Sequence, residues 1–336
     1  MKSMRTLDKS RGTDARGTLS IFRSIHAVKW PFSCESGTRK RQCFTGVLRM
    51  FPPILRMSMQ GEEIGRREFL RRASHGCAAL VAGGAVPRLS AEPLRIGLVA
   101  AGASVTRGVT LGVEEAARTG TLFGRSIELV TGTAESLAGR RGLAALVGGS
   151  GEAPARAASA VAERAGVLFL NAGTPADALR GCGRNTFHVE ASAAMYAAAG
   201  ARAVLWHPSL ERFGAAQLND RFRARFGGAM DGPAWAGWMA VKVLWEASLR
   251  ARSTQPAALR AYLARGDTRF DGHKGWPLSF RAWDRQLRQP LYRLDAAGKV
   301  AGEVPARGAA GGASSGELLD RLGAGPSAST CRGGTR

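Results

Sequence analysis

Short, mostly apolar runs alternate with helix-length segments in the first half of the folded sequence. Apolar residues recur near the helical period over 105–118 and through an alanine-rich segment, 153–165. Strands that alternate with such helices predict βαβ units and a mainly parallel α/β sheet. Because the strands are apolar almost throughout, we expect helices to cover both faces of that sheet. The predicted strands are 95–100, 127–130, 143–147, 167–170 and 186–189.

The pattern changes after residue 190. Three tryptophans, Trp235, Trp238 and Trp245, lie on one face of the helical segment 233–250. Such a stripe predicts a helix that faces the core, with a cofactor site as the less favoured interpretation. Further helices are predicted over 191–201, 211–226 and 256–264, and strands over 203–206, 278–280 and 291–294. Beyond Asp295, Gly, Ala and Ser dominate, and we predict a disordered tail over 296–336.

An export signal is indicated upstream of the folded sequence. Arg66 and Arg67 are followed by Phe69 and Leu70, and then by a weakly hydrophobic Ala, Gly and Val run of about 14 residues. This order is typical of a twin-arginine signal, and the run is too short to span a bilayer as a helix. We therefore predict passage through the twin-arginine translocase into the periplasm, with cleavage near Ala91. A basic amphipathic segment followed by an ordinary alanine-rich helix is the alternative.

The signal sets the predicted domain organisation. A signal peptide covers 57–91, and the preceding residues 1–56 are basic and lack periodicity, which indicates a disordered or over-extended N-terminus. A first α/β lobe is predicted over 92–190. A residual second lobe with the C-terminal helices follows over 191–295.

Charge and cysteine patterns exclude several classes of function. Lys and Arg number 48 against 26 Asp and Glu, a formal net charge of +22, but residues 1–91 hold 17 and 6 of these and so carry half the excess. The other arginines are dispersed, and no run of five like charges occurs, so we predict no nucleic-acid partner. No Cys-x-x-Cys or His-x-x-x-His spacing is present, so no metal site and no cofactor are predicted.

Two loops at the carboxyl ends of predicted strands hold candidate ligand contacts. The loop 148–152 offers the Ser150 hydroxyl and backbone N–H groups at the start of a helix, where anions bind. Asn171 follows the next predicted strand, 167–170, and is placed to orient the loop after it. In open α/β sheets ligands bind at such carboxyl ends. A tight turn in which Ser or Thr caps the helix is the structural alternative. The candidate residues of the second loop are Ala172, Gly173 and Thr174.

The sequence contains no comparable pattern of catalytic or nucleotide-binding residues. The glycines between Gly97 and Gly108 do not have the dinucleotide-binding spacing, and no acidic residue ends the second strand. None of the histidines His188, His207 and His273 has a Ser, Cys or acidic partner at an informative spacing. We therefore predict that the protein is not an enzyme.

Five segments, in this order, resemble the substrate-binding proteins of branched-chain-amino-acid (Leu/Ile/Val-binding) ABC transporters, which are type I periplasmic binding proteins. The last of them includes Trp283–Pro290 and is similar to a branch found beside quinoprotein alcohol dehydrogenase systems. The segments are 96–117, 123–129, 168–174, 238–247 and 270–292.

This resemblance implies a periplasmic-binding-protein-like fold with two α/β lobes that close on a ligand. It implies an exported component that captures a small organic molecule, such as an amino acid, an alcohol-derived molecule or a carboxylate, and delivers it to a membrane permease. Ser150 and Ala172–Thr174 would contact that ligand. The sequence after Glu190 is too short for a second lobe of comparable size, so we expect a shortened one. The alternative is a truncated, non-binding remnant or a scaffold in periplasmic quinoprotein alcohol oxidation.

Overall fold

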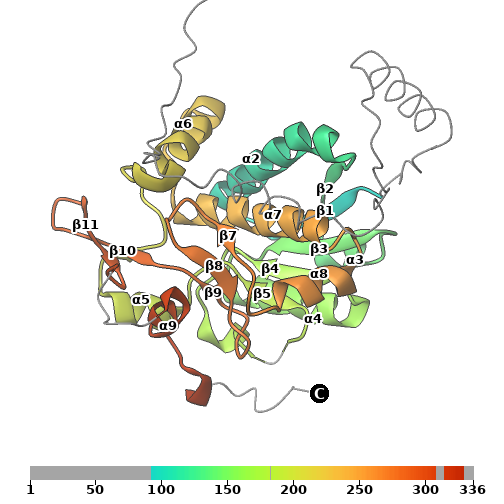
Figure 1. Ribbon diagram of the computed structural model, residues 1–336. Helices are drawn as coiled ribbons and strands as arrows, with labels where there is room; N and C mark the ends of the chain where they lie inside the picture. The colour runs from blue at the N-terminus through green and yellow to red at the C-terminus, as the bar shows by residue number, and fades with distance from the viewer. Residues whose placement is uncertain (1–91, 182, 308–313, 329–336) are drawn as a thin grey trace, which may run out of the picture. The chain divides into compact units, whose positions relative to one another are not determined.

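The apolar runs of the first half form a five-stranded parallel sheet in the computed structural model (Figure 1). Its strand order is β2-β1-β3-β4-β5, and Gly97 of the interior strand β1 pairs with Val130 on one side and Leu146 on the other. All five predicted strands are therefore confirmed. They are β1 (Leu94–Val99), β2 (Ile127–Thr131), β3 (Leu143–Gly148), β4 (Leu168–Asn171) and β5 (Thr186–His188).

The structure describes residues 92–181, 183–307 and 314–328, which all belong to one unit, Gly83–Arg336. The segment 1–56, the signal peptide over 57–91 and the cleavage site near Ala91 lie outside the described residues. We call residues 92–190 the amino lobe, and residues 191–307 with 314–328 the carboxyl region.

Helices cover both faces of the sheet, as the apolar strands predict. Side chains of Leu94, Ile96 and Leu98 point to one face and join one core cluster, whereas Val99 and Leu146 join a second cluster on the other face. The first face is covered by α2 (Ala103–Gly120), α7 (Gly232–Arg250) and α8 (Pro256–Leu263). The second face is covered by α3 (Ala134–Ala138) and α4 (Glu152–Ala165), as Figure 1 shows.

Helices α2 and α7 pack unusually closely. A Cβ atom at Gly108 would overlap the Ala234 carbonyl oxygen, and one at Gly237 would overlap the Val105 carbonyl oxygen, so both positions require glycine. A helix of the carboxyl region therefore completes the core of the amino lobe, and the predicted boundary at residue 190 does not separate two cores. The stripe formed by Trp235, Trp238 and Trp245 is buried, which confirms the prediction of a core-facing helix.

After β5 the described strands are short and antiparallel. They form two three-stranded sheets, with orders β11-β10-β6 and β7-β8-β9. The predicted strand at 203–206 is present only at its start, and the predicted helix at 211–226 begins with a 3-10 turn. The strands are β6 (Ala203–Val204), β7 (Phe270–Asp271), β8 (Pro277–Phe280), β9 (Leu287–Arg288), β10 (Leu291–Leu294) and β11 (Val300–Val304), and the helices include α5 (Ala193–Ala199), η3 (Arg212–Gly214), α6 (Ala215–Phe226) and α9 (Ser315–Asp320).

The prediction of a disordered tail over 296–336 is wrong for part of that segment, because β11 and α9 lie within it. Helix α9 begins with a capping box in which Ser314 and Glu317 bond each other's backbone N–H groups. Leu318 and Leu319 of the helix are buried, as is Leu322 just after it. The prediction rested on composition, and the many Gly, Ala and Ser residues of this segment outweighed its few leucines.

Candidate functional site

The loop after β3 places Ser150 at the carboxyl edge of the sheet. Gly148, Gly149 and Gly151 all have positive φ angles, of 137°, 79° and 99°, which L side chains rarely adopt. The Ser150 backbone N–H donates to the Ala100 carbonyl oxygen at 2.7 Å. Its Oγ accepts from the Gly102 backbone N–H at 2.8 Å, which leaves the hydroxyl proton free to donate.

Asn171 shapes the neighbouring loop after β4. This fully buried amide accepts from the backbone N–H groups of Gly173 at 3.2 Å and Thr174 at 3.1 Å, and it donates to the Thr174 carbonyl oxygen at 2.8 Å. The structure therefore shows Asn171 orienting the loop. Its Nδ2 also lies 3.2 Å from Nδ1 of His188, at the end of β5.

The two loops contact each other. A Cβ atom at Gly173 would lie 2.7 Å from both the backbone nitrogen and Oγ of Ser150, so only glycine fits there. Ser150 and Gly173 are partly exposed, whereas Ala172 is buried and Thr174 is 5% exposed. The structure thus brings all four predicted ligand residues to one edge, with Ser150 and Gly173 at its surface.

Two helices begin beside Ser150. The N-cap residues of α2 and α4 are Gly102 and Gly151, and neither receives a side-chain cap from the described residues. The first N–H groups of a helix have no intrahelical partner, and the helix dipole places partial positive charge there. Ser150 does not cap α4, so the structural alternative fails for that residue. Thr174 Oγ1 accepts weakly, at 3.4 Å, from the Ala176 backbone N–H. Free N–H groups and a serine hydroxyl suit a carboxylate.

Behind these loops lies a buried polar cluster that the sequence reasoning missed. Arg180 donates to Oε1 of Gln286 at 2.9 Å and to the carbonyl oxygens of Ala176 at 2.7 Å and Glu190 at 2.9 Å. Burial lowers the pKa of Arg180 to about 10, against the raising effects of Asp177 and Glu190. Gln286 lies 106 residues from Arg180 in the sequence, so no local spacing could have indicated the pair.

Glu190 is the acid of this cluster. Its carboxylate accepts from the Tyr196 hydroxyl at 2.6 Å and from the Ala191 backbone N–H at 3.0 Å. Burial raises the pKa of Glu190, although these hydrogen bonds and the Arg180 charge act in the other direction. Among the described residues, every buried side-chain nitrogen or oxygen has a hydrogen-bond partner. The cluster is therefore internally satisfied, which indicates a structural role.

Lys274 extends the buried polar layer towards α7. Its Nζ donates to Oε1 of Gln289 and to the Pro290 carbonyl oxygen, both at 3.1 Å, and lies 3.9 Å from the centre of the Trp235 ring. Burial holds the pKa of Lys274 well below its usual value. Polar acceptors and an aromatic face together make a buried ammonium tolerable at this position.

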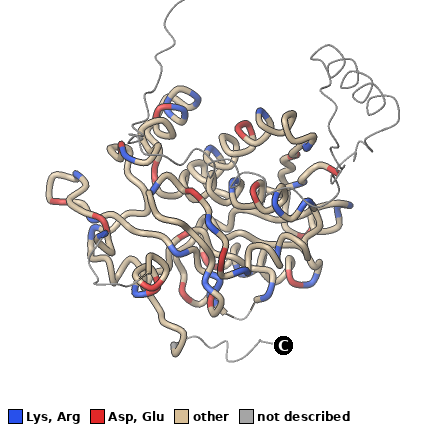
Figure 2. Tube along the Cα trace, viewed as in Figure 1, with Lys and Arg blue, Asp and Glu red and all other residues tan. Residues whose placement is uncertain are grey.

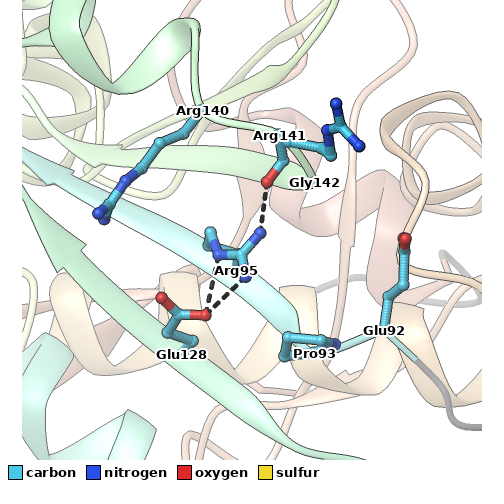
Figure 3. Close-up of a pocket in the computed structure, with 7 residues that line it drawn as sticks. All are labelled: Glu92, Pro93, Arg95, Glu128, Arg140, Arg141 and Gly142. Atoms are coloured by element: carbon cyan, nitrogen blue, oxygen red, sulfur yellow. Dashed lines mark hydrogen bonds and ion pairs between the residues drawn. The ribbon is translucent and has the colours of Figure 1, made fainter.

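Three hollows of the described residues are not lined by Ser150 or Ala172–Thr174. One, of about 520 Å³, is lined by Arg95, Glu128, Arg140 and their neighbours at the opposite edge of the sheet (Figure 3). Another, of about 550 Å³, lies between the end of α7 and the loop after α8. A third, of about 430 Å³, lies along the start of α4 and includes Glu152 and Arg156 in its lining. Ser150 and Gly173 themselves are partly exposed.

Within the described ranges, no group of three or more His, Cys, Asp or Glu side chains is arranged to hold a metal ion. None of the helices in that part of the chain combines the length and the apolar character needed to cross a bilayer.

No protein-family model and no curated protein matches the sequence. Solved structures do match. The branched-chain amino acid transporter substrate-binding protein LivJ of Streptococcus pneumoniae, solved with isoleucine, has a TM-score of 0.52 at 15% identity over 63% of this chain and 99% of LivJ. A periplasmic binding protein of Burkholderia mallei has a TM-score of 0.54 at 14% identity, over 64% of this chain and 95% of that one. An ABC transporter substrate-binding protein of Sphaerobacter thermophilus has a TM-score of 0.53 at 14% identity, over 64% and 98%.

LivJ and the Sphaerobacter thermophilus protein are substrate-binding proteins of transporters. At such low identity the likeness establishes the architecture and leaves the ligand open. The five-stranded parallel sheet with helices on both faces is the arrangement they share with this chain. The chain therefore has the α/β fold of the periplasmic binding proteins.

Proposed function

We propose that this protein is the exported solute-binding component of an ABC-type transport system, and that it captures a small organic molecule without covalent chemistry. One observation carries the proposal: Ser150 and Gly173 meet at the carboxyl edge of a periplasmic-binding-protein-like sheet, between the uncapped starts of α2 and α4. Ligands of open α/β sheets bind at that edge. The neighbour LivJ was solved with isoleucine, which supports a small ligand of similar size.

The ligand class follows from the donors on this edge. The Ser150 hydroxyl and the first N–H groups of two helices are hydrogen-bond donors in a region of partial positive charge. A carboxylate matches them, so we propose an amino acid or an alcohol-derived carboxylic acid as the ligand. A membrane permease would receive the ligand.

The site is tested by calorimetry with amino acids, short carboxylic acids, alcohols and aldehydes. Ser150→Ala should lower affinity by about 1.5–3 kcal/mol for a carboxylate and by about 0.5–1.5 kcal/mol for a neutral ligand, because one hydroxyl hydrogen bond is lost. Thr174→Ala should act similarly, with part of its effect appearing as lower melting temperature. Thr119→Ala is the control, since that hydroxyl bonds the Glu115 and Ala116 carbonyl oxygens in the last turn of α2, at the other end of that helix from Gly102. Unchanged affinity in the Ser150 and Thr174 double variant would place the site elsewhere.

A non-binding scaffold is the second candidate function, in line with the similarity of the final segment to proteins of quinoprotein alcohol oxidation. The observation in its favour is that buried side chains hold the carboxyl region against the amino lobe, as Gln286 does through the His188 and Glu190 carbonyl oxygens. A clam-shell binder needs a hinge that opens. Absence of heat with every compound in the calorimetric series would favour this second candidate.

Export is proposed to depend on Arg66 and Arg67, with Phe69 and Leu70 completing the signal for the twin-arginine translocase. Replacing both arginines by lysine should abolish the appearance of mature protein in the periplasmic fraction. Arg71→Lys with Arg72→Lys is the matched control, because it makes the same chemical change in the two arginines that follow Leu70. Undiminished export of the first variant would exclude this route.

A further inference from the structure

The amino-terminal edge of the main sheet, opposite Ser150, gathers basic side chains from distant parts of the sequence. Strands β1, β2 and β3 begin there, and α2 and α7 end there, since Gly120 lies against Trp245. Gln255, just before α8, contacts Glu92, just before β1, through a distance of 3.4 Å between Gln255 Nε2 and Glu92 Oε2. Figure 2 shows Lys and Arg positions recurring along the side of this unit where β1 begins.

The hollow at the start of β1 is the first basic feature of this edge. Arg95 forms an ion pair there, because its Nε and a terminal nitrogen both lie 2.8 Å from Oε2 of Glu128. Arg140 and Arg141 follow α3, and their guanidinium groups form no ion pair with the described residues. Figure 3 shows the Arg141 guanidinium turned away from the Arg95–Glu128 pair. The lining also contains the Glu92 carboxylate, so three arginines lie with two carboxylates there and the hollow keeps a positive charge.

The hollow at the end of α7 is the second basic feature. Its lining contains four arginines and one aspartate. Arg265 takes up Asp267 through bonds of 2.6 and 2.9 Å, and Arg269 bonds the Thr268 carbonyl oxygen at 2.8 Å. Arg250 and Arg252 are exposed and, within the described residues, have no ion-pair partner. An arginine near a helix C-terminus is favoured by the helix dipole, but this does not account for four at one hollow.

Two large apolar side chains project from the same edge. Leu122 is 81% exposed and Phe123 is 60% exposed, in the turn η1 (Thr121–Phe123) that joins α2 to β2. Arg118 and Arg125 flank the turn in the sequence. Phe213, the other strongly exposed large apolar residue of the described chain, is instead covered by the Arg307 guanidinium at 4.2 Å. Leu122 and Phe123 are therefore apolar tips on a basic surface.

We propose that this edge docks on an anionic phospholipid surface. Arg140, Arg141, Arg250 and Arg252 would face lipid phosphates, and Leu122 and Phe123 would enter the headgroup region. The exposed aliphatic side chain of Leu122 beside Phe123 favours a lipid surface over single-stranded nucleic acid, because bases stack on aromatic rings. Docking through this edge leaves the Ser150 edge open to solvent. The inference is independent of the proposed solute site.

The test is sedimentation of the full chain with vesicles that contain phosphatidylglycerol, and with vesicles of phosphatidylcholine alone. Every variant carries the same residues 1–91, so differences between variants report on the edge. Binding to the anionic vesicles should weaken steeply with salt. Arg140→Glu with Arg141→Glu, and Arg250→Glu with Arg252→Glu, should each lower binding at least about tenfold. Leu122→Ser with Phe123→Ser should lower it several-fold.

Arg212→Glu with Arg223→Glu is the matched control, because it makes the same change in net charge at exposed positions around α6. It should lower binding far less than either arginine pair of the basic edge. Equal losses in the control and the test variants, equal binding to phosphatidylcholine vesicles, or binding unaffected by all three double variants would each overturn the proposal. Binding to heparin as strong as to the anionic vesicles, and equally insensitive to Leu122 and Phe123, would also overturn it.

Discussion

The amino lobe and the carboxyl region differ in the kind of hydrogen bond that stabilises each of them. In the amino lobe, strands of three to six residues pair in parallel register, and backbone groups satisfy one another. In the carboxyl region three of the six strands have only two residues. One segment of that region, 274–289, holds six buried polar side chains, which are Lys274, Ser279, Arg281, Asp284, Gln286 and Gln289.

Long polar side chains replace backbone pairing where strands are short. Gln286 Nε2 donates to the carbonyl oxygens of His188 and Glu190 at 3.2 and 3.0 Å, and Gln289 Nε2 donates to the Val189 carbonyl oxygen at 2.7 Å. A buried carbonyl without a partner costs about 1–3 kcal/mol, although a satisfied hydrogen bond contributes only about 1 kcal/mol. We therefore expect single side chains to be critical for stability in the carboxyl region, and close backbone approaches to be critical for stability in the amino lobe.

Arg281 offers the strongest test of that contrast. This buried guanidinium lies 3.4 Å from Asp284 and 3.2 Å from Asp320, and it donates to the Leu319 carbonyl oxygen at 2.8 Å, which fastens α9. Arg281→Ala leaves a buried carboxylate and helix carbonyls unpaired, so the free energy of unfolding should fall by about 3–5 kcal/mol. Urea unfolding measures it.

Arg223→Ala is the control for Arg281→Ala, because Arg223 forms an exposed pair with Asp220. Such pairs contribute about 0–1 kcal/mol. A similar loss in both variants would show that the carboxyl region does not depend on this buried arginine.

Gly108 tests the backbone contact between α2 and α7. Gly108→Ala would force the added Cβ against the Ala234 carbonyl group and the Trp238 nitrogen, so the helices must separate. Overpacking of this kind lowers the free energy of unfolding by about 1–3 kcal/mol. Gly139→Ala is the control, since a Cβ there meets nothing within 4 Å. Equal melting temperatures for the two variants would contradict the close packing.

The amino lobe was predictable because its signals are local. Each strand is a short apolar run, each helix repeats near 3.6 residues, and the carboxyl ends of parallel strands must meet at one edge. From these facts the sequence predicts that Ser150 lies near Ala172–Thr174, and the structure places Gly173 against Ser150. The helix start after the loop 148–152 was also predicted, and it is that of α4. The position of the α2 start beside Ser150 was not predicted, because Gly102 and Ser150 lie 48 positions apart.

The carboxyl region was less predictable because its contacts join distant residues. Gln286 reaches His188 across 98 positions, and Gln289 reaches Val189 across 100, so no window of sequence contains either contact. The arginines of the basic edge were interpreted as dispersed for the same reason. Arg140 and Arg250 belong to different parts of the sequence and line two separate hollows of this edge.

His188 joins the two regions and makes the smallest predicted effect, a dependence of stability on pH. Burial, and then the Arg180 charge, hold the pKa of His188 well below its ordinary value of about 6.5. The unfolded chain therefore takes up a proton as the pH falls below about 6.5, while the folded protein does not. Folding stability is lost in that direction, by up to about 1.4 kcal/mol for each pH unit.

His188→Gln should flatten the fall in unfolding free energy between pH 6.5 and pH 5, because the substituted side chain does not titrate. Its amide oxygen can still accept from Nδ2 of Asn171, as Nδ1 of His188 does at 3.2 Å, so the ligand loop keeps its support. Glu190 acts in the opposite sense, since burial raises its pKa and the folded protein gains a proton first as the pH falls. The unfolding free energy of the parent can therefore change less steeply with pH than His188 alone would make it. The prediction concerns the difference in this slope between the parent and His188→Gln. His207→Gln is the control on an exposed loop, and a variant His188→Gln that kept the parent's slope would show that another group controls the acid response.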